Sequence, residues 1–297
     1  MADVNTVTRS VVSDMDRQRP TVRIGLLCVQ VLILLGLLVA GLGPLLWLLK
    51  SALSTSQDIL REPMALWPSG IQWHNLPDAW TKVRIGAYLG NTAWVAIGSW
   101  LANLFICTTG GYVLSVLRPK WGKFLSGAVL ATLFIPGIIS LVPLYLTVLH
   151  MPLVGVSLQN TYWAVWLPAA ANAFNVMVIK RFFDALPRDL FEAARIDGAG
   201  PVRVFAYIVL PLSRPILGVI SLLAVIAAWK DYLWPLLVLT DPSKQPISVA
   251  LPRVQDSTPL SLQMGALFLA LIIPVILFLI FQKQFLRGIG TAGAIKG

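Results

Sequence analysis

The chain has 297 residues, of which 57% are hydrophobic and only 12% are charged. Soluble domains average roughly 25% charged residues, so this composition predicts a membrane protein that crosses the bilayer several times. The formal net charge of +10 does not indicate a nucleic-acid partner, because the basic residues are scattered between apolar runs and form no stripe with aromatic interleaving.

Six apolar segments are long enough to cross a hydrocarbon core, which takes ~20 helical residues. They are residues 24–49, 88–117, 124–149, 161–179, 212–237 and 262–281. The fold class that we expect is therefore all-α, with six transmembrane helices in a membrane domain of residues 24–285. The first segment is too long for the apolar core of a signal peptide and lacks a small-residue cleavage site, so we expect it to be retained.

Basic residues gather in the N-terminal tail, in the second-to-third and fourth-to-fifth loops, and in the C-terminal tail. Cytoplasmic loops collect Lys and Arg, so we expect both termini in the cytoplasm. Residues 1–23 are expected to form a flexible N-terminal tail, and residues 286–297 a C-terminal tail. The loop between the fourth and fifth segments is then cytoplasmic as well.

Nothing in the sequence indicates a metal site or a catalytic site. Cys28 and Cys107 lie inside apolar runs and are expected to be small buried hydrophobic residues. His74 and His150 are isolated, with no metal-ligand spacing around them. The Ser, His and acidic residues are not spaced for nucleophilic work, and no Gly-x-x-x-x-Gly-Lys-Ser/Thr run for binding ATP is present. We expect a chain that is not an enzyme and that carries no cofactor itself.

The apolar segments are rich in proline, which kinks a helix and frees a carbonyl. Membrane helices tolerate this where neighbours or a water-filled cavity satisfy the freed group. The pattern fits a bundle with a cavity or a moving gate, and it equally fits ordinary proline usage in membrane helices.

Residues 184–211 form a polar, patterned connection between the fourth and fifth segments. Pro187 suits the first turn of a helix, and Asp189 lies where the helix dipole favours an anion. Ala193 and Ala194 are expected to share a small-residue face that is open to a partner. Gly198 can end the helix in a left-handed conformation, and a second short helix can begin near Pro201. A plain connection would be short, so we expect a docking element for a soluble partner.

At these residues the chain resembles the ABC-importer permeases, whose EAA loop has this spacing. The matching positions are Glu192, Ala193, Ala194, Asp197, Gly198, Ile208, Leu210 and Pro211. Three further segments are similar to the carbohydrate, maltose-type branch: "SLQNTYWAVWLP" (157–168), "AAWKDYLWPLLVL" (227–239) and "GTAGAIKG" (290–297). Lys230 departs from that branch, which usually has Asn there.

The resemblance implies a permease in a prokaryotic plasma membrane that carries a sugar or oligosaccharide. Its partners would be a second permease, a dimer of ATP-binding subunits, an extracytoplasmic binding protein and the membrane lipids. ATP and Mg²⁺ would bind to the ATPase and not to this chain. The EAA residues would form a coupling helix that is seated in a cleft of the ATPase.

The resemblance also suggests two sets of contact residues. The proline-rich loop after the fifth segment would reach into the binding protein, or it is a plain connection; its candidates are Asp241, Pro242, Lys244, Gln245, Pro246 and Arg253. Aromatic and amide groups suit a neutral polyhydroxyl ligand, and such groups in the spans serve helix packing equally well. The candidates for the substrate pathway are Asn103, Tyr145, Trp166, Asn172 and Asn175.

Other functions stay open at this point. An ABC permease for amino acids, peptides or phosphate shares the EAA loop, and only the flanking segments favour sugar. An ion-coupled secondary transporter normally places acidic residues or His inside its spans, whereas here no acidic residue occurs in the six segments before Asp231. A membrane enzyme or scaffold lacks support from any catalytic pattern.

Overall fold

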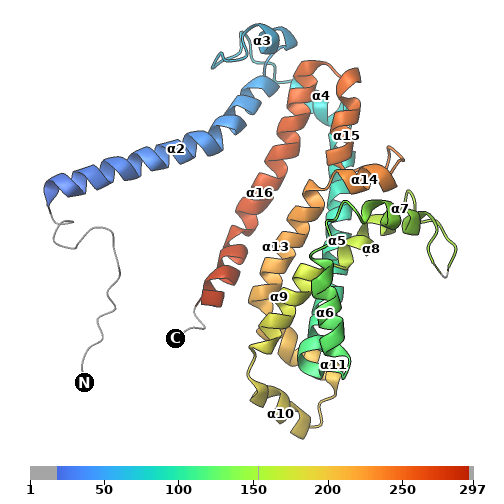
Figure 1. Cartoon of the computed structure of the whole chain (residues 1–297). Helices are drawn as coiled ribbons and strands as arrows, with labels where there is room; N and C mark the ends of the chain where they lie inside the picture. The colour runs from blue at the N-terminus through green and yellow to red at the C-terminus, as the bar shows by residue number, and fades with distance from the viewer. Residues whose placement is uncertain (1–18, 153, 294–297) are drawn as a thin grey trace.

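The computed structural model describes residues 19–152 and 154–293, and in these residues the chain is helical and contains no strand. Figure 1 shows an elongated bundle with short helices at both ends. The helices are α2 Pro20–Ala52, α3 Ser56–Arg61, α4 Asn75–Lys82, α5 Ile85–Tyr112, α6 Gly122–Thr132, α7 Leu141–Leu149, α8 Trp163–Ala170, α9 Ala173–Asp184, α10 Arg188–Ile196, α11 Pro201–Val204, α12 Leu210–Leu212, α13 Arg214–Lys230, α14 Leu233–Val238, α15 Ile247–Val254 and α16 Leu260–Gly293. Two π-helical turns, η1 Val113–Leu117 and η2 Phe205–Val209, and a 3-10 turn, η3 Gln255–Ser257, complete them.

Helix α5 is the centre of the bundle, and it contacts α4, α8, α9, α13, α15 and α16. Two glycines let its neighbours approach closely. A Cβ added at Gly98 would lie 2.0 Å from the Trp166 ring, and one at Gly111 would lie 2.8 Å from the Ile179 side chain. Because the helices meet at positions without side chains, α5 packs against α8 and α9 along its length.

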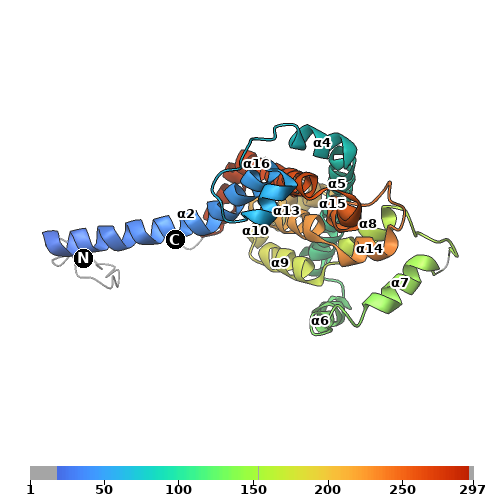
Figure 2. The same ribbon diagram turned by 90° about the horizontal axis from the view of Figure 1, so that it is seen from above.

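Helix α2 contacts the bundle through α16, and its buried residues are Lys50, Ser51 and Ala52 at its end. Its most apolar window has a mean hydropathy of 2.7, and none of that window is buried. Figures 1 and 2 show the helix leaving the bundle at its α3 end and extending sideways. A helix that is apolar all round belongs in hydrocarbon or against another protein surface. Helix α2 therefore confirms the first expected segment as a helix and leaves the surface of its most apolar window to be covered.

Three of the expected spans are each divided between two helices, and their crossing of the membrane stays a prediction. Segment 124–149 divides into α6 and α7, segment 161–179 into α8 and α9, and segment 212–237 into α13 and α14. The proline ring clashes with the carbonyl four residues earlier. Accordingly α6 ends at Thr132, four residues before Pro136, and α13 ends just before Asp231, four residues before Pro235.

The two tails are also shorter than expected. Residues 20–23 begin α2, and α16 continues to Gly293, so most of the expected C-terminal tail is helical. The remaining N-terminal tail and residues 294–297 lie outside the described residues. By length and composition, two described helices are suited to crossing a membrane, α2 and α5 continued by η1; the pair Pro201–Leu212 and Arg214–Lys230, bent by 81°, makes a third if it is counted as one.

The close approach at Gly111 leads to a prediction. A Gly111→Ala variant places a methyl group 2.8 Å from the Ile179 side chain and 3.2 Å from the Lys180 backbone nitrogen. We expect this overpacking to lower the free energy of unfolding by about 1–3 kcal/mol, seen as a lower thermal midpoint in detergent. Gly110→Ala is the matched control, since its Cβ meets nothing closer than 3.8 Å; equal midpoints for the two variants would contradict the assigned packing.

Candidate functional site

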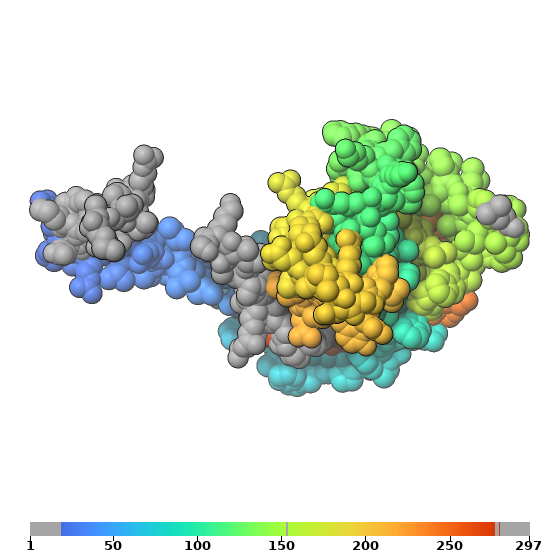
Figure 3. All heavy atoms as spheres, turned by 90° about the horizontal axis from the view of Figure 1, so that it is seen from below, coloured from blue at the N-terminus to red at the C-terminus, as the bar shows by residue number. Residues whose placement is uncertain are grey.

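Helix α10 lies at one end of the molecule, beyond the ends of α9 and α13 (Figure 1). Asp189 is in its first turn and Arg195 in its last, as the helix dipole favours. Phe191 and Ala194 are buried in the same apolar cluster as Val204 of α11. We call residues 188–204 the α10–α11 segment. In Figure 3 this end is seen face on, with the segment in yellow and orange beside α6 in green.

The expected small-residue face is only partly correct. Ala193 is exposed beside Glu192, but Ala194 is 7% exposed and packs inward. The reason is helical geometry, because Ala194 lies one turn from Phe191, and that residue is the apolar anchor of the helix, at 3% exposed. Glu192 and Ala193 are therefore the residues of the motif that the helix offers to solvent, together with Ile196, which is 87% exposed.

Gly198 ends α10 as the sequence predicts. Its φ is +77°, in the left-handed region, and the backbone N–H of Ala199 donates to the carbonyl of Ala194 at 2.9 Å while that of Gly198 donates to Arg195 at 3.0 Å. This pair of hydrogen bonds is the Schellman motif. A Cβ at Gly198 would meet no atom within 4 Å, so the constraint on this position is the backbone conformation and not crowding.

A hollow of about 440 Å³ separates α10 from the helices that follow it. It brings together three residues that the motif identifies, Ala194, Asp197 and Ile208. Sequence reasoning missed three other lining residues, Ala199, Arg203 and Tyr207. Of the remaining motif residues, Leu210 is half-buried and Pro211 is exposed, and neither lines the hollow.

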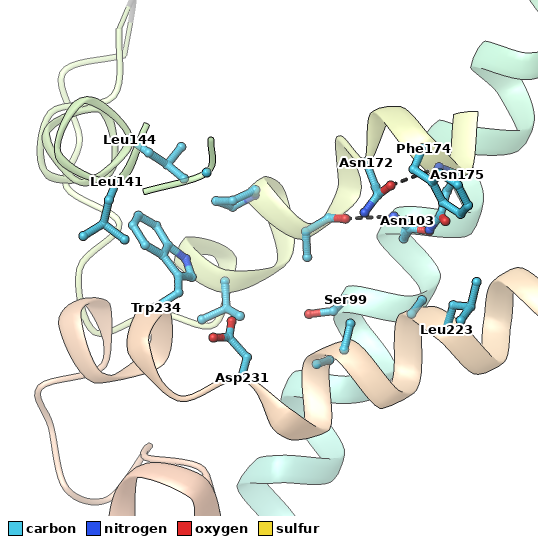
Figure 4. Close-up of a pocket in the computed structure, with 17 residues that line it drawn as sticks. Ser99, Asn103, Leu141, Leu144, Asn172, Phe174, Asn175, Leu223, Asp231 and Trp234 are labelled. Carbon is cyan, nitrogen blue, oxygen red and sulfur yellow. Dashed lines mark hydrogen bonds between the residues drawn. The ribbon is translucent and has the colours of Figure 1, made fainter. Parts of the chain in front are cut away.

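A second, larger cavity of about 570 Å³ lies between the broken helices and α5. Figure 4 shows Asn103, Asn172 and Asn175 grouped at one side of it and Asp231 and Trp234 at the other. The predicted pathway residues Asn103, Asn172 and Asn175 thus line the cavity. Tyr145 and Trp166 do not: Tyr145 packs against an apolar cluster, and Trp166 lies among Trp94, Tyr162 and Trp163.

The helix breaks supply the polar groups around this cavity. Asn172 caps α9 by accepting a hydrogen bond from the backbone N–H of Asn175 at 3.0 Å. The Asn175 amide donates to Asn103 Oδ1 at 2.9 Å, and the Asn103 amide donates to the Ala169 carbonyl at 2.9 Å. A helix break inside an apolar segment requires such partners.

Two lining residues, Ser99 and Asp231, could not be assigned to the cavity from the sequence. Within the described residues the Ser99 hydroxyl oxygen is buried without a hydrogen-bond partner. Asp231 is the only ionisable residue among those that line the cavity in the described part of the chain. No spacing rule identifies either residue, because each reaches the cavity only through the packing of α5 against α13.

The loop of residues 239–246 is tied down, and this limits the expected contact with a binding protein. Asn160 Oδ1 accepts a hydrogen bond from the Asp241 N–H at 2.7 Å, and the Lys244 ammonium donates to the Asn160 carbonyl at 2.8 Å. Gln245 and Pro246 are buried. Of the candidate residues, Pro242 and Arg253 are exposed and Asp241 and Lys244 are half-buried.

Two features show that the exposed part of this region is ordered. The backbone N–H and hydroxyl of Ser243 donate to the Asp241 carboxylate, and these bonds hold the pKa of Asp241 below its usual value. Arg253 Nη2 donates to the Tyr88 hydroxyl at 3.1 Å, which ties α15 to the first turn of α5.

The geometry defines a membrane protein with the fold of an ABC-importer permease. A crystal structure of a bacterial ABC transporter that imports the acidic polysaccharide alginate superposes with a TM-score of 0.77 at 21% identity, covering 93% of this chain and 99% of the other. Residues 95–289 match the family described as "binding-protein-dependent transport system inner membrane component".

Curated relatives agree with this match. A probable ABC transporter permease of Bacillus subtilis is 34% identical, over 88% of this chain and 85% of its own length. An arabinooligosaccharide transport permease of Halalkalibacterium halodurans is 31% identical over 86% and 91%, and an sn-glycerol-3-phosphate transport permease of Agrobacterium fabrum is 29% identical over 93% and 98%. The chain belongs to the family of inner membrane components of binding-protein-dependent transport systems. It is a permease subunit and not the ATPase.

The asparagine pair leads to a second prediction. In Asn175→Ala, the buried Oδ1 of Asn103 loses its donor, and we expect the free energy of unfolding to fall by about 1 kcal/mol. In the Asn175→Ala background, Asn103→Ala should lower the free energy of unfolding by less than it does in the wild type, because the two amides share one hydrogen bond. Thermal midpoints of the wild type, both single variants and the double variant measure this coupling; strictly additive effects would contradict it.

Proposed function

We propose that this chain is one of two permease subunits of an ATP-driven importer for a sugar or oligosaccharide that an extracytoplasmic binding protein delivers. The observation that carries the proposal is the α10–α11 segment, a short helix that ends at Gly198 and lies beyond the bundle, in a chain of a binding-protein-dependent transport family. On this proposal ATP and Mg²⁺ bind to a separate ATPase, and Glu192, Ala193 and the rim of the 440 Å³ hollow contact it.

The second permease is supported by α2. This helix buries none of its most apolar window within the chain, and such a surface is stable only against lipid or another apolar surface.

We propose six membrane crossings with both termini in the cytoplasm: α2, α5 with η1, α6 with α7, α8 with α9, α13 with α14, and α16. The broken crossings face the cavity, where irregular backbone is tolerated.

A neutral sugar fits the cavity better than an anionic one. Relatives of this chain include permeases named for sn-glycerol-3-phosphate, an anion, and for diacetylchitobiose and arabinooligosaccharides. The only ionisable residue among the described lining residues is the acid Asp231, which lies across the cavity from the amides of Asn103 and Asn175. The described lining residues include no basic side chain that would pair with an anion, whereas the amide and carboxyl groups can exchange hydrogen bonds with hydroxyl groups.

Gentle purification of the tagged chain from its native membrane tests the assembly. We expect a second multi-span permease, an ATP-binding subunit and a binding protein to accompany it, identified by mass spectrometry. The binding protein would then name the solute, through its shift in thermal midpoint with a panel of neutral sugars, sugar phosphates and amino acids. Recovery of the chain alone, in a detergent that preserves other transporter complexes, would contradict the proposal.

Gly198 tests the coupling role. Because its φ is +77°, a side chain there costs roughly 1–2 kcal/mol, and more when it is β-branched. We expect Gly198→Val to leave the chain inserted in the membrane and to reduce uptake in proteoliposomes by about tenfold or more. A conformational free energy of this size corresponds to about a tenfold change, and the variant also loses the docking geometry. Gly198→Asn is the matched control, since Asn tolerates this conformation. Uptake by Gly198→Val at the wild-type rate would contradict the coupling role.

A further inference from the structure

The end of the α10–α11 segment that follows Gly198 is held by α5. The Tyr112 hydroxyl donates a hydrogen bond to the Pro201 carbonyl at 2.9 Å, and the Tyr112 ring packs on that of Phe205 with centroids 5.0 Å apart. Tyr112 is 6% exposed. A buried hydrogen bond beside a ring contact fixes both the position and the direction of the first turn of α11.

The end of α9, which leads into the segment, is held by η1, the continuation of α5. Asp184, the last residue of α9, accepts a hydrogen bond from the Ser115 hydroxyl at 2.8 Å, and Ser115 is fully buried in η1. Lys180 pairs with the same carboxylate at 2.8 Å. Arg118 and Arg188 lie farther off, at 3.6 and 3.9 Å, and Arg188 is the first residue of α10.

The geometry of α5 explains why one helix reaches both ends. Tyr112 and Ser115 are three residues apart, and the turn between them widens into the π-helical η1. Arg118, in the left-handed region at φ +49°, closes that turn by donating from its Nε to the Ser115 carbonyl at 2.8 Å. The π-helical turn is thus the last turn of this helix, and it carries Ser115.

The same helix makes polar contacts at two further levels. In its middle, Asn103 binds the broken α8–α9 connection at the wall of the cavity. In its first turns, the Asn91 amide donates to the carbonyls of Ser243 and Gln245 at 2.8 and 3.0 Å, and Thr92 Oγ1 accepts from the Ile247 N–H at 2.8 Å. Helix α5 continues into η1 without a break, so these contacts all lie on one uninterrupted element.

We propose that α5 with η1 is the transmission element of this permease. Tyr112 and Asp184 are positioning residues that clamp the α10–α11 segment at both ends, so that its displacement passes along α5 to the cavity and to the 239–246 loop as one body. The inference rests on the proposed coupling to an ATPase. It adds that the displacement of the α10–α11 segment is transmitted through α5, although the segment is joined in sequence to α9 and α13.

The test uses the purified complex of both permeases, the ATPase and the binding protein in proteoliposomes. The binding protein is used as it is purified from the cells. The measured quantity is stimulation, which is the ATPase rate with the binding protein divided by the ATPase rate without it. Tyr112→Phe removes one hydroxyl, and Asp184→Asn removes one charge. Tyr232→Phe and Asp78→Asn are the matched controls: Tyr232 is 43% exposed, and Asp78 pairs with Lys82 at 2.8 Å outside the proposed clamp.

We expect stimulation by the binding protein to fall about threefold or more in both clamp variants, with an unchanged KM for ATP and unchanged stimulation in both controls. A purely structural role would lower the yield of complex and leave stimulation per assembled complex at the wild-type value, and that result would overturn the inference. If Asp184→Asn assembles poorly, Tyr112→Phe, normalised to assembled complex, decides alone. A wild-type chain that binds no ATPase would overturn the proposed function, and the clamp with it, before any variant is made.

Discussion

A carbonyl freed by a proline inside an apolar segment has to find a donor within the protein, because hydrocarbon offers none. The structure meets this constraint with side chains from neighbouring helices. The indole N–H of Trp234 donates to the Ala164 carbonyl at 2.9 Å, four residues before Pro168, and the Ser248 hydroxyl donates to the Asp231 carbonyl at 2.7 Å, four residues before Pro235. The first bond supports α8, which continues past Pro168 to Ala170, and the second supports the break between α13 and α14 beside the central cavity.

The broken helices make the cavity, and the continuous helix α5 organises it. Residues at each break line the space that α5 borders, among them Gly137, Asn172 and Asp231, so the wall carries a few polar groups in an otherwise apolar lining. Because α5 has no proline between Ile85 and Leu117, it keeps its own backbone bonds and contributes side chains to its neighbours instead. This division between interrupted and uninterrupted helices gives the permease a mostly apolar cavity with a few polar groups in its wall, and one unbroken helix beside it.

The sequence predicts local features well and packing poorly. The helix after Pro187, the left-handed Gly198 and the helix start at Pro201 follow from capping and turn chemistry, and the structure confirms all three. The prolines indicated kinked helices, but the positions of the breaks were not located, because hydropathy averages over a proline as if the helix continued. Ala194 turned out to be buried and Trp166 to lie outside the cavity, since which face of a helix meets which neighbour is decided by contacts between distant segments.

The central claim is that the α10–α11 segment, α5 and the 239–246 loop move as one body. Spin labels at Val202→Cys and Pro242→Cys, in a chain whose Cys28 and Cys107 are replaced, report this directly, because Val202 and Pro242 are both exposed. The distance between the labels is measured in the full complex without nucleotide and in the state trapped with ATP and vanadate. The account predicts the same distance in both states while the distance from Val202 to a label on the second permease changes. A shift of the Val202–Pro242 distance between the two states would contradict it.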